Sequence, residues 1–173
     1  YTVFAYDILN ESVAKFSSSK KHQEFRSALE FIKELKPKSI AIYDRLYGSY
    51  PMMSLHEKHK NYYIVRMKVL GTRLPDPLFD FIESKERDKS VIWSDSKNAG
   101  EDISVRLVKV FNKKTKEMLV FATNLSKEEF SPTEILALYR KRWSIESCFR
   151  DLTSTLKLGE WHSKKINGIL QEI

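Results

Sequence analysis

The alternation of hydrophobic and polar positions at the start of the chain predicts a hairpin followed by a helix. Residues 2–9 are rich in β-branched and aromatic types, and residues 12–16 return after a turn at Asn10-Glu11. Apolar positions then recur at three- and four-residue spacing, which predicts a helix of about fifteen residues. Pro37 ends that helix because proline cannot continue it.

Two further strands and a short helix are predicted next. The apolar run 39–43 is short and bounded by turn signals, so we interpret it as a buried strand reached by a crossover. Asp44 ends this strand. Sites in open α/β sheets are built where strands end, which makes Asp44 a candidate functional residue; a cap for the following turn is the simpler alternative. A helix over 51–59 and a strand over 62–68 follow.

The pattern changes character at Gly71. Residues 91–93 form a short apolar run, and 103–125 alternate around a lysine-rich turn, which predicts a strand and a second hairpin. Residues 78–83 are ambiguous, and no convincing helical pattern occurs in this region. We therefore predict a β-rich insertion over residues 71–130.

The last region, residues 131–173, is predicted to carry one long helix and the start of another. Ser131-Pro132-Thr133-Glu134 has the form of a capping box with proline in the first turn. Helical geometry places Tyr139, Arg142 and Glu146 on one face, within about 60° of each other, beside the apolar stripe. Glu146 is thus a candidate site carboxylate. Pairing with Arg142 or Arg150 on a solvated face is the simpler alternative. The stripe comprises Ile135, Leu138, Ile145, Phe149, Leu152 and Leu156.

Composition narrows the function. The 173 residues carry 30 Lys and Arg against 23 Asp and Glu, a net charge of +7 that favours polyanionic partners, nucleic acid first. The single cysteine, Cys148, excludes a disulfide framework and is typical of a reducing cytosol. His56 and His59 lack further ligands nearby, so we interpret them as a solvated helix face and not as part of a zinc site.

No apolar run has the length of a membrane span, and no signal peptide is recognisable. We therefore expect a cytoplasmic protein. The chain opens on Tyr1 without a methionine and ends within a helical pattern, so we expect it to be the middle of a longer protein.

Two motifs and the order of elements resemble a known family. Tyr139, Arg142 and Glu146 match the first three positions of the Tyr-x2-Arg-x3-Glu-x6-Lys signature of cut-and-paste DDE transposases from bacterial insertion sequences. The stretch Tyr43-Asp44-Arg45-x-Tyr47 resembles the family's second-acid motif. The resemblance implies a ribonuclease H-like α/β fold, a mixed sheet with flanking helices, with residues 1–70 and 131–173 as its core and 71–130 as its β-rich insertion.

The chain departs from the family pattern at two points. The signature lysine falls on Thr153, and Lys157, one turn further on, is a candidate substitute. The first catalytic aspartate belongs to a strand before residue 2, and no residue of this chain takes that role. In the family's sheet that strand is central, between the first hairpin and the strand of Asp44. We expect it to be missing here and its neighbours to have exposed edges.

The resemblance implies cleavage and strand transfer at transposon ends in double-stranded DNA, assisted by Mg²⁺ or Mn²⁺, in the bacterial nucleoid. Asp44 and Glu146 would be the catalytic metal ligands, because hard cations prefer carboxylate oxygen. Arg142 and Tyr139 would hold phosphate near the cleaved bond. A homodimer on paired ends is also implied. Further candidates for DNA backbone contacts, each equally consistent with a solvated face, are Arg140, Lys141, Arg150, Lys164 and Lys165.

A second hypothesis is an inactive DNA-binding remnant of a transposase. Thr153 and the lack of the first acid favour it, whereas the presence of both Asp44 and Glu146 argues for an active parent enzyme. We expect residues 1–173 alone to have little or no activity.

Overall fold

The computed structural model describes residues 2–18, 23–69, 74–94, 101–113 and 115–155. The chain divides into two compact units, one of residues 1–31 and 141–173 and the other of residues 32–140. Each unit is described by itself. None of the helices in the described residues has the length and hydropathy that a membrane span requires.

The first unit contains the predicted hairpin. Strands β1 (Thr2–Asp7) and β2 (Ser12–Ser18) pair antiparallel, and the rings of Phe4 and Phe16 lie 5.1 Å apart across the pair. The Asp7 carboxylate closes the turn, since its Oδ1 accepts from the backbone N–H groups of Leu9 at 2.9 Å and Asn10 at 3.1 Å. The hairpin prediction is confirmed. The same unit contains helix α5 (Trp143–Thr155).

Helix α1 (Glu24–Glu34) follows the hairpin and is shorter than predicted. Ala28 and Ile32 of its expected apolar stripe are buried, as the spacing predicts. Phe25 is 38% exposed, so the buried stripe is narrower than the sequence pattern indicates.

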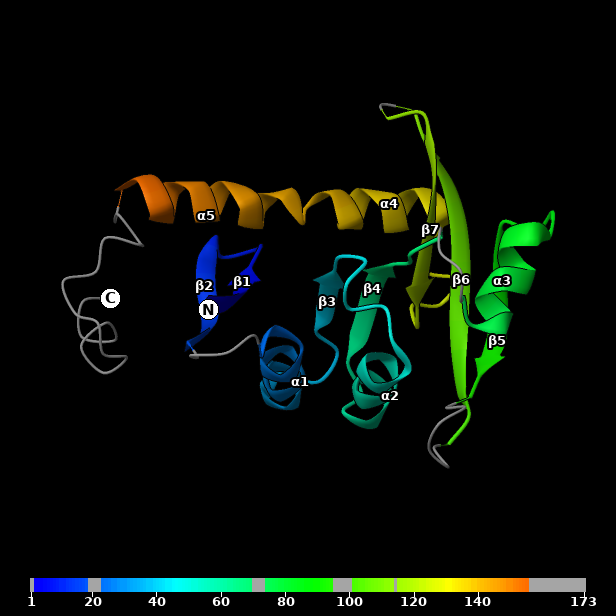
Figure 1. The fold of residues 1–173 in the computed structure, drawn as a ribbon, viewed down its shortest axis with the longest axis horizontal. Helices are drawn as coiled ribbons and strands as arrows, with labels where there is room; N and C mark the ends of the chain where they lie inside the picture. Colours follow the sequence, from blue (N-terminus) through cyan, green and yellow to red (C-terminus); the bar gives the residue numbers. More distant parts are fainter. Residues whose placement is uncertain (1, 19–22, 70–73, 95–100, 114, 156–173) are drawn as a thin grey trace. The chain divides into compact units, whose positions relative to one another are not determined.

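The second unit is built on a five-stranded sheet of order β3-β4-β7-β6-β5 (Figure 1). Strand β3 (Ile40–Tyr43) runs parallel to β4 (Tyr62–Arg66), and all other pairs are antiparallel. Strands β5 (Asp88–Trp93), β6 (Ile103–Asn112) and β7 (Glu117–Thr123) come from the segment predicted as an insertion, and they extend the same sheet as β3 and β4.

Helices cover both faces of this sheet. Helices α2 (Tyr50–Lys58) and α3 (Asp76–Glu83) contribute Met53, Leu78 and Phe81 to the apolar core on one face. Helix α4 (Pro132–Arg140) contributes Ile135, Leu136 and Tyr139 to the core on the other face. Burial on both faces explains why β4 and β7 are nearly continuous apolar runs.

Helix α3 contradicts the prediction that residues 71–130 lack a helix. Pro75 and Pro77 stand at the start of the segment whose pattern is ambiguous, and proline ordinarily interrupts a helix. Instead Pro75 flanks the helix and Pro77 lies in its first turn, where a missing backbone N–H is tolerated. Leu78 and Phe81 then face the core at three-residue spacing.

The prediction of a single long helix after Ser131 is also wrong. Helix α4 ends at Arg140, and α5 begins at Trp143 after a turn at Lys141-Arg142. The predicted capping box is present: Glu134 Oε2 accepts from the Ser131 N–H at 2.8 Å, and Ser131 Oγ accepts from the Glu134 N–H at 3.4 Å.

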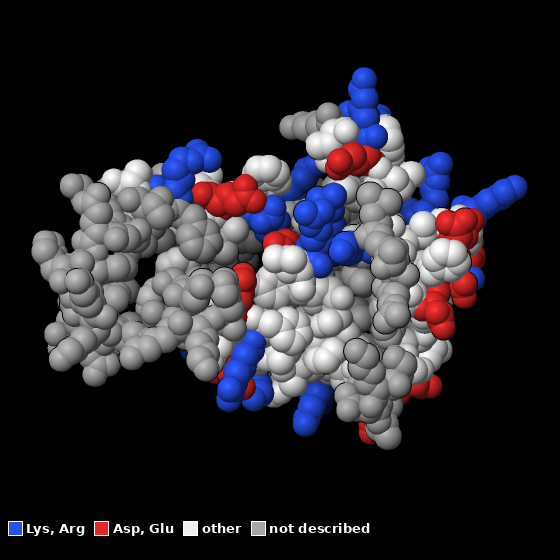
Figure 2. Space-filling model, viewed as in Figure 1, with Lys and Arg blue, Asp and Glu red and all other residues white. Residues whose placement is uncertain are grey.

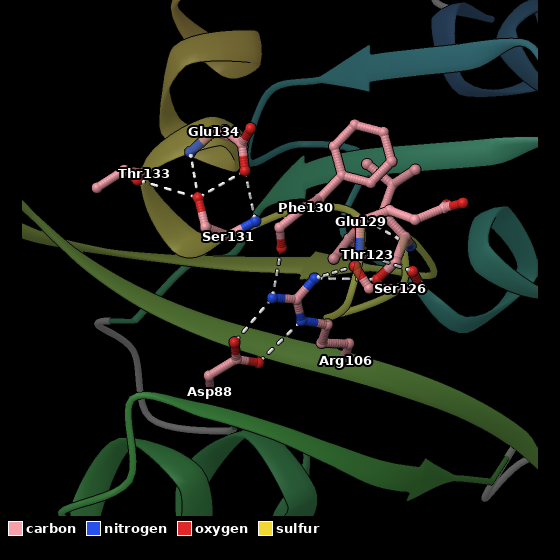
Figure 3. A network of polar contacts seen from close by, with 10 residues as sticks. Asp88, Arg106, Thr123, Ser126, Glu129, Phe130, Ser131, Thr133 and Glu134 are labelled. Atoms are coloured by element: carbon pink, nitrogen blue, oxygen red, sulfur yellow. Dashed lines mark hydrogen bonds and ion pairs between the residues drawn. The ribbon is translucent and has the colours of Figure 1, made fainter.

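A buried arginine joins β5, β6 and the loop that leads into α4 (Figure 3). Arg106 is 5% exposed, and its guanidinium donates two hydrogen bonds to the Asp88 carboxylate at 2.7 and 2.8 Å. It also donates to the carbonyls of Leu125, Ser126 and Phe130 at 2.8–3.1 Å. These five bonds use all five guanidinium N–H groups, so the charge is buried with every donor satisfied.

Candidate active site

Asp44 lies directly after β3, at the carboxyl end of a strand that pairs in parallel with β4. Its Oδ1 accepts a hydrogen bond from the Leu46 N–H at 2.8 Å, and its carbonyl accepts from the Tyr47 N–H at 3.3 Å. The side chain is half-buried. Asp44 therefore has the turn-capping contact anticipated as the simpler alternative, at a position where α/β folds also build sites.

Glu146 and Arg142 are brought together at the start of α5. Arg142 Nη2 donates to Glu146 Oε1 at 2.7 Å, and the two side chains are 21% and 41% exposed. Glu146 lies in the first helical turn, where the helix dipole favours a negative charge. A partly exposed pair at this spacing adds about 0.3–0.5 kcal/mol to stability. Its main consequence is therefore to orient the Glu146 carboxylate.

The signature's tyrosine is buried more deeply than its predicted position beside the apolar stripe indicates. Tyr139 is 6% exposed and packs its ring 4.8 Å from that of Phe121, in the core beneath α4. Because the helix is broken at Lys141-Arg142, the helical angle between Tyr139 and Arg142 no longer follows from one continuous helix. The structure gives Tyr139 a core-packing role.

The candidate DNA-contacting cations fall into two groups. Arg140, Lys141 and Arg150 are exposed, and Arg140 Nη2 also donates to Asn112 Oδ1 at 3.2 Å. On the face shown in Figure 2, Lys and Arg side chains are scattered, with Asp and Glu side chains between several of them. Three predicted residues lie outside the described residues: Lys157, Lys164 and Lys165. The Thr153 side chain is likewise not described.

The metal chemistry expected of this site needs several oxygen ligands. Carboxylates such as Asp44 and Glu146 suit hard divalent cations. In the described part of the chain, however, no three His, Cys, Asp or Glu side chains gather in a metal-binding group. The two carboxylates thus have suitable chemistry without forming a complete ligand set among the described residues.

Comparison with protein families decides the identity. The family model described as the transposase DDE domain matches residues 4–173. The chain belongs to this transposase family. No curated protein sequence matches it.

For a transposase DDE domain, DNA is the implied substrate, and the family generally uses divalent metal ions. The mixed α/β sheet with flanking helices fits the ribonuclease H-like domain of such enzymes. The resemblance on which the family was predicted is therefore confirmed at the level of the family.

The exposure predicted for His56 from the sequence was wrong. His56 was predicted on a solvated helix face, but it is fully buried against β3 and β4. Burial, with a smaller contribution from His59, lowers the pKa of His56 to about 4, so the ring is neutral near pH 7. The burial of His56 could have been predicted from its spacing of three and four residues from Met53 and Met52, because the three side chains share the buried face of α2.

Proposed function

We propose that this chain is the catalytic domain of a cut-and-paste transposase that cleaves and joins DNA strands at transposon ends. The family match over residues 4–173 carries the proposal, because it includes both Asp44 and Glu146. The Tyr139, Arg142 and Glu146 spacing further supports the subgroup with the Tyr-x2-Arg-x3-Glu signature.

Asp44 and Glu146 would serve as metal ligands, with Mg²⁺ or Mn²⁺ as the ion. When bound, the metal would supply a Lewis acid for in-line displacement at a phosphodiester. Arg142 orients the Glu146 carboxylate at 2.7 Å, and a guanidinium is suited to binding a nonbridging phosphate oxygen. A third acid is needed, and the family resemblance assigns it to a strand that is not among the strands of the described residues.

The edges of the two sheets support the same proposal. Strand β3 pairs with β4 alone in the described residues, and β1 pairs only with β2. A family-type strand that carries the first aspartate could pair with the free edge of β3. Unpaired edges of this kind otherwise invite pairing with other chains.

Substitution of the two acids in the full-length protein tests the proposal. Mg²⁺-dependent cleavage of a duplex carrying the element's ends should be lost in Asp44→Ala and in Glu146→Ala. Glu128→Ala, which removes an exposed carboxylate from the loop before α4, should cleave normally. Cleavage that persists in Glu146→Ala would show that the site assignment is wrong.

The same assay distinguishes an active transposase from the competing hypothesis, an inactive DNA-binding remnant. A remnant would retain binding to DNA, with the salt dependence of a basic protein, while the unmodified full-length protein would show no cleavage. Metal-dependent cleavage by the unmodified protein excludes it.

A further inference from the structure

A buried cluster of aromatic rings lies against the segment that carries Asp44. Tyr43 is the last residue of β3, and its hydroxyl and His56 Nε2 on α2 form a hydrogen bond of 3.0 Å. The two rings meet edge to face with centroids 5.6 Å apart. This contact joins the end of β3 to the helix that follows the Asp44 loop.

The loop itself is tied back to the same cluster. The Tyr47 ring packs against that of Tyr43 with centroids 5.4 Å apart, while the Tyr47 N–H donates to the Asp44 carbonyl. The backbone at Gly48 lies so close to Met67 that a Cβ there would stand 3.1 Å from the Met67 Sδ. The chain from Asp44 to Gly48 is therefore fixed by contacts on both sides.

The hydrogen bond between Tyr43 and His56 joins two neutral groups. Burial raises the pKa of the Tyr43 phenol above its usual range, and His56 is neutral near pH 7. Whichever tautomer is present, a single proton can be shared between the phenol oxygen and Nε2. A buried polar pair of this kind specifies one geometry, because breaking it leaves two unsatisfied groups in an apolar core.

We propose that Tyr43 and His56 are positioning residues that set the direction of the Asp44 carboxylate for metal binding. The proposal rests on the proposed catalytic role of Asp44. The hydroxyl of Tyr43 fixes the ring against which Tyr47 packs, and Tyr47 in turn fixes the Asp44 turn. Loss of the hydrogen bond should therefore weaken metal binding more than it weakens the fold.

Four substitutions in the full-length protein test this. Tyr43→Phe removes the hydroxyl and keeps the ring. His56→Asn places an amide near Nδ1 and cannot reach the phenol, whereas His56→Gln places one near Nε2 and can restore the bond. Tyr63→Phe is the matched control, because its buried hydroxyl belongs to the same cluster and has no hydrogen-bond partner among the described residues.

The measurement is the Mg²⁺ concentration for half-maximal cleavage of transposon-end DNA, together with the melting temperature. Tyr43→Phe and His56→Asn should raise that concentration about tenfold, the scale found when outer-shell partners of metal ligands are removed. His56→Gln and Tyr63→Phe should stay within about twofold of the unmodified protein, and excess Mg²⁺ should restore cleavage by Tyr43→Phe.

The outcomes separate this inference from the proposed function. Cleavage by Asp44→Ala would remove the basis of both. If Asp44→Ala is inactive while Tyr43→Phe and His56→Asn keep the normal Mg²⁺ dependence, the positioning role is wrong and the proposed function stands. Lower melting temperatures with unchanged Mg²⁺ dependence would assign the pair a structural role only.

Discussion

The buried ion pair of Arg106 and Asp88 gives the sharpest stability prediction. Asp88→Ala removes the countercharge of a guanidinium that is 5% exposed and cannot lose its proton. The three carbonyl bonds to Leu125, Ser126 and Phe130 remain. The variant therefore keeps a buried positive charge without its carboxylate.

The expected loss follows from the burial of both partners. Side-chain exposures of 5% and 11% place the pair in the interior, where removal of one partner costs about 3–5 kcal/mol. For a chain of this size, each kcal/mol lowers the melting temperature by about 2–4 °C. Asp88→Ala should therefore melt about 6–20 °C below the unmodified protein.

A neighbouring ion pair supplies the control. Lys89 Nζ lies 2.6 Å from Glu86 Oε2, but the two side chains are 48% and 50% exposed. Exposed pairs add about 0.2–1 kcal/mol, so Lys89→Met should lower the melting temperature by at most about 4 °C. Thermal unfolding followed by circular dichroism compares the two variants. Equal shifts would refute the reasoning from burial.

The double variant Asp88→Ala/Arg106→Met tests the role of the carbonyl bonds. Removing the uncompensated charge usually recovers stability. Here it would also leave the Leu125, Ser126 and Phe130 carbonyls without their donor, at about 1–3 kcal/mol for each group that stays buried. We expect the double variant to be no more stable than Asp88→Ala. Recovery would show that these carbonyls are satisfied in another way.

Three more predictions concern α4. Hydrogen bonds with Ser131 hold the pKa of the Glu134 carboxyl below its usual value of 4.5. The ionised carboxylate therefore adds its full stabilisation above pH 4.5, and this stabilisation is lost as the pH falls through the lowered pKa of the folded protein. Glu134→Gln should flatten this acid-side decline in a pH series of melting temperatures, and an unchanged slope would contradict the assignment. Tyr139→Ala should lower the free energy of unfolding, measured with urea, by about 3–5 kcal/mol because the ring is buried against Phe121. Tyr139→Phe should retain DNA cleavage if the residue only packs, and loss of cleavage would instead support a phosphate contact.

Local signals were sufficient to predict much of the fold. The hairpin, the strand before Asp44 and the capping box at Ser131 each depend on residues close in sequence, and each is present. The break at Lys141-Arg142 was missed because apolar spacing continues across it and neither proline nor glycine marks it. Helix α3 was missed because its apolar pattern is short and proline usually interrupts helices, whereas Pro77 here occupies the first turn.

The candidate site was predictable in its residue types but not in its geometry. Residue types and spacing made Asp44, Arg142 and Glu146 candidates, and the 2.7 Å contact of Arg142 with Glu146 follows from their four-residue spacing. The burial of Tyr139 and His56 depends on which sheet face each helix covers, which is a tertiary property. The hydrogen bond between Tyr43 and His56 likewise joins elements whose packing no local pattern specifies.

The strand order also has a consequence for how the second unit folds. Strand β4 pairs with β7, and the Tyr63 N–H donates to the side chain of Asn124, 61 positions later. The β6–β7 hairpin closes locally, but β4 gains its second neighbour only after this long loop has closed. Pairings so distant in sequence slow folding. During synthesis, β3 and β4 emerge well before β7, the strand that joins them to β6 and β5.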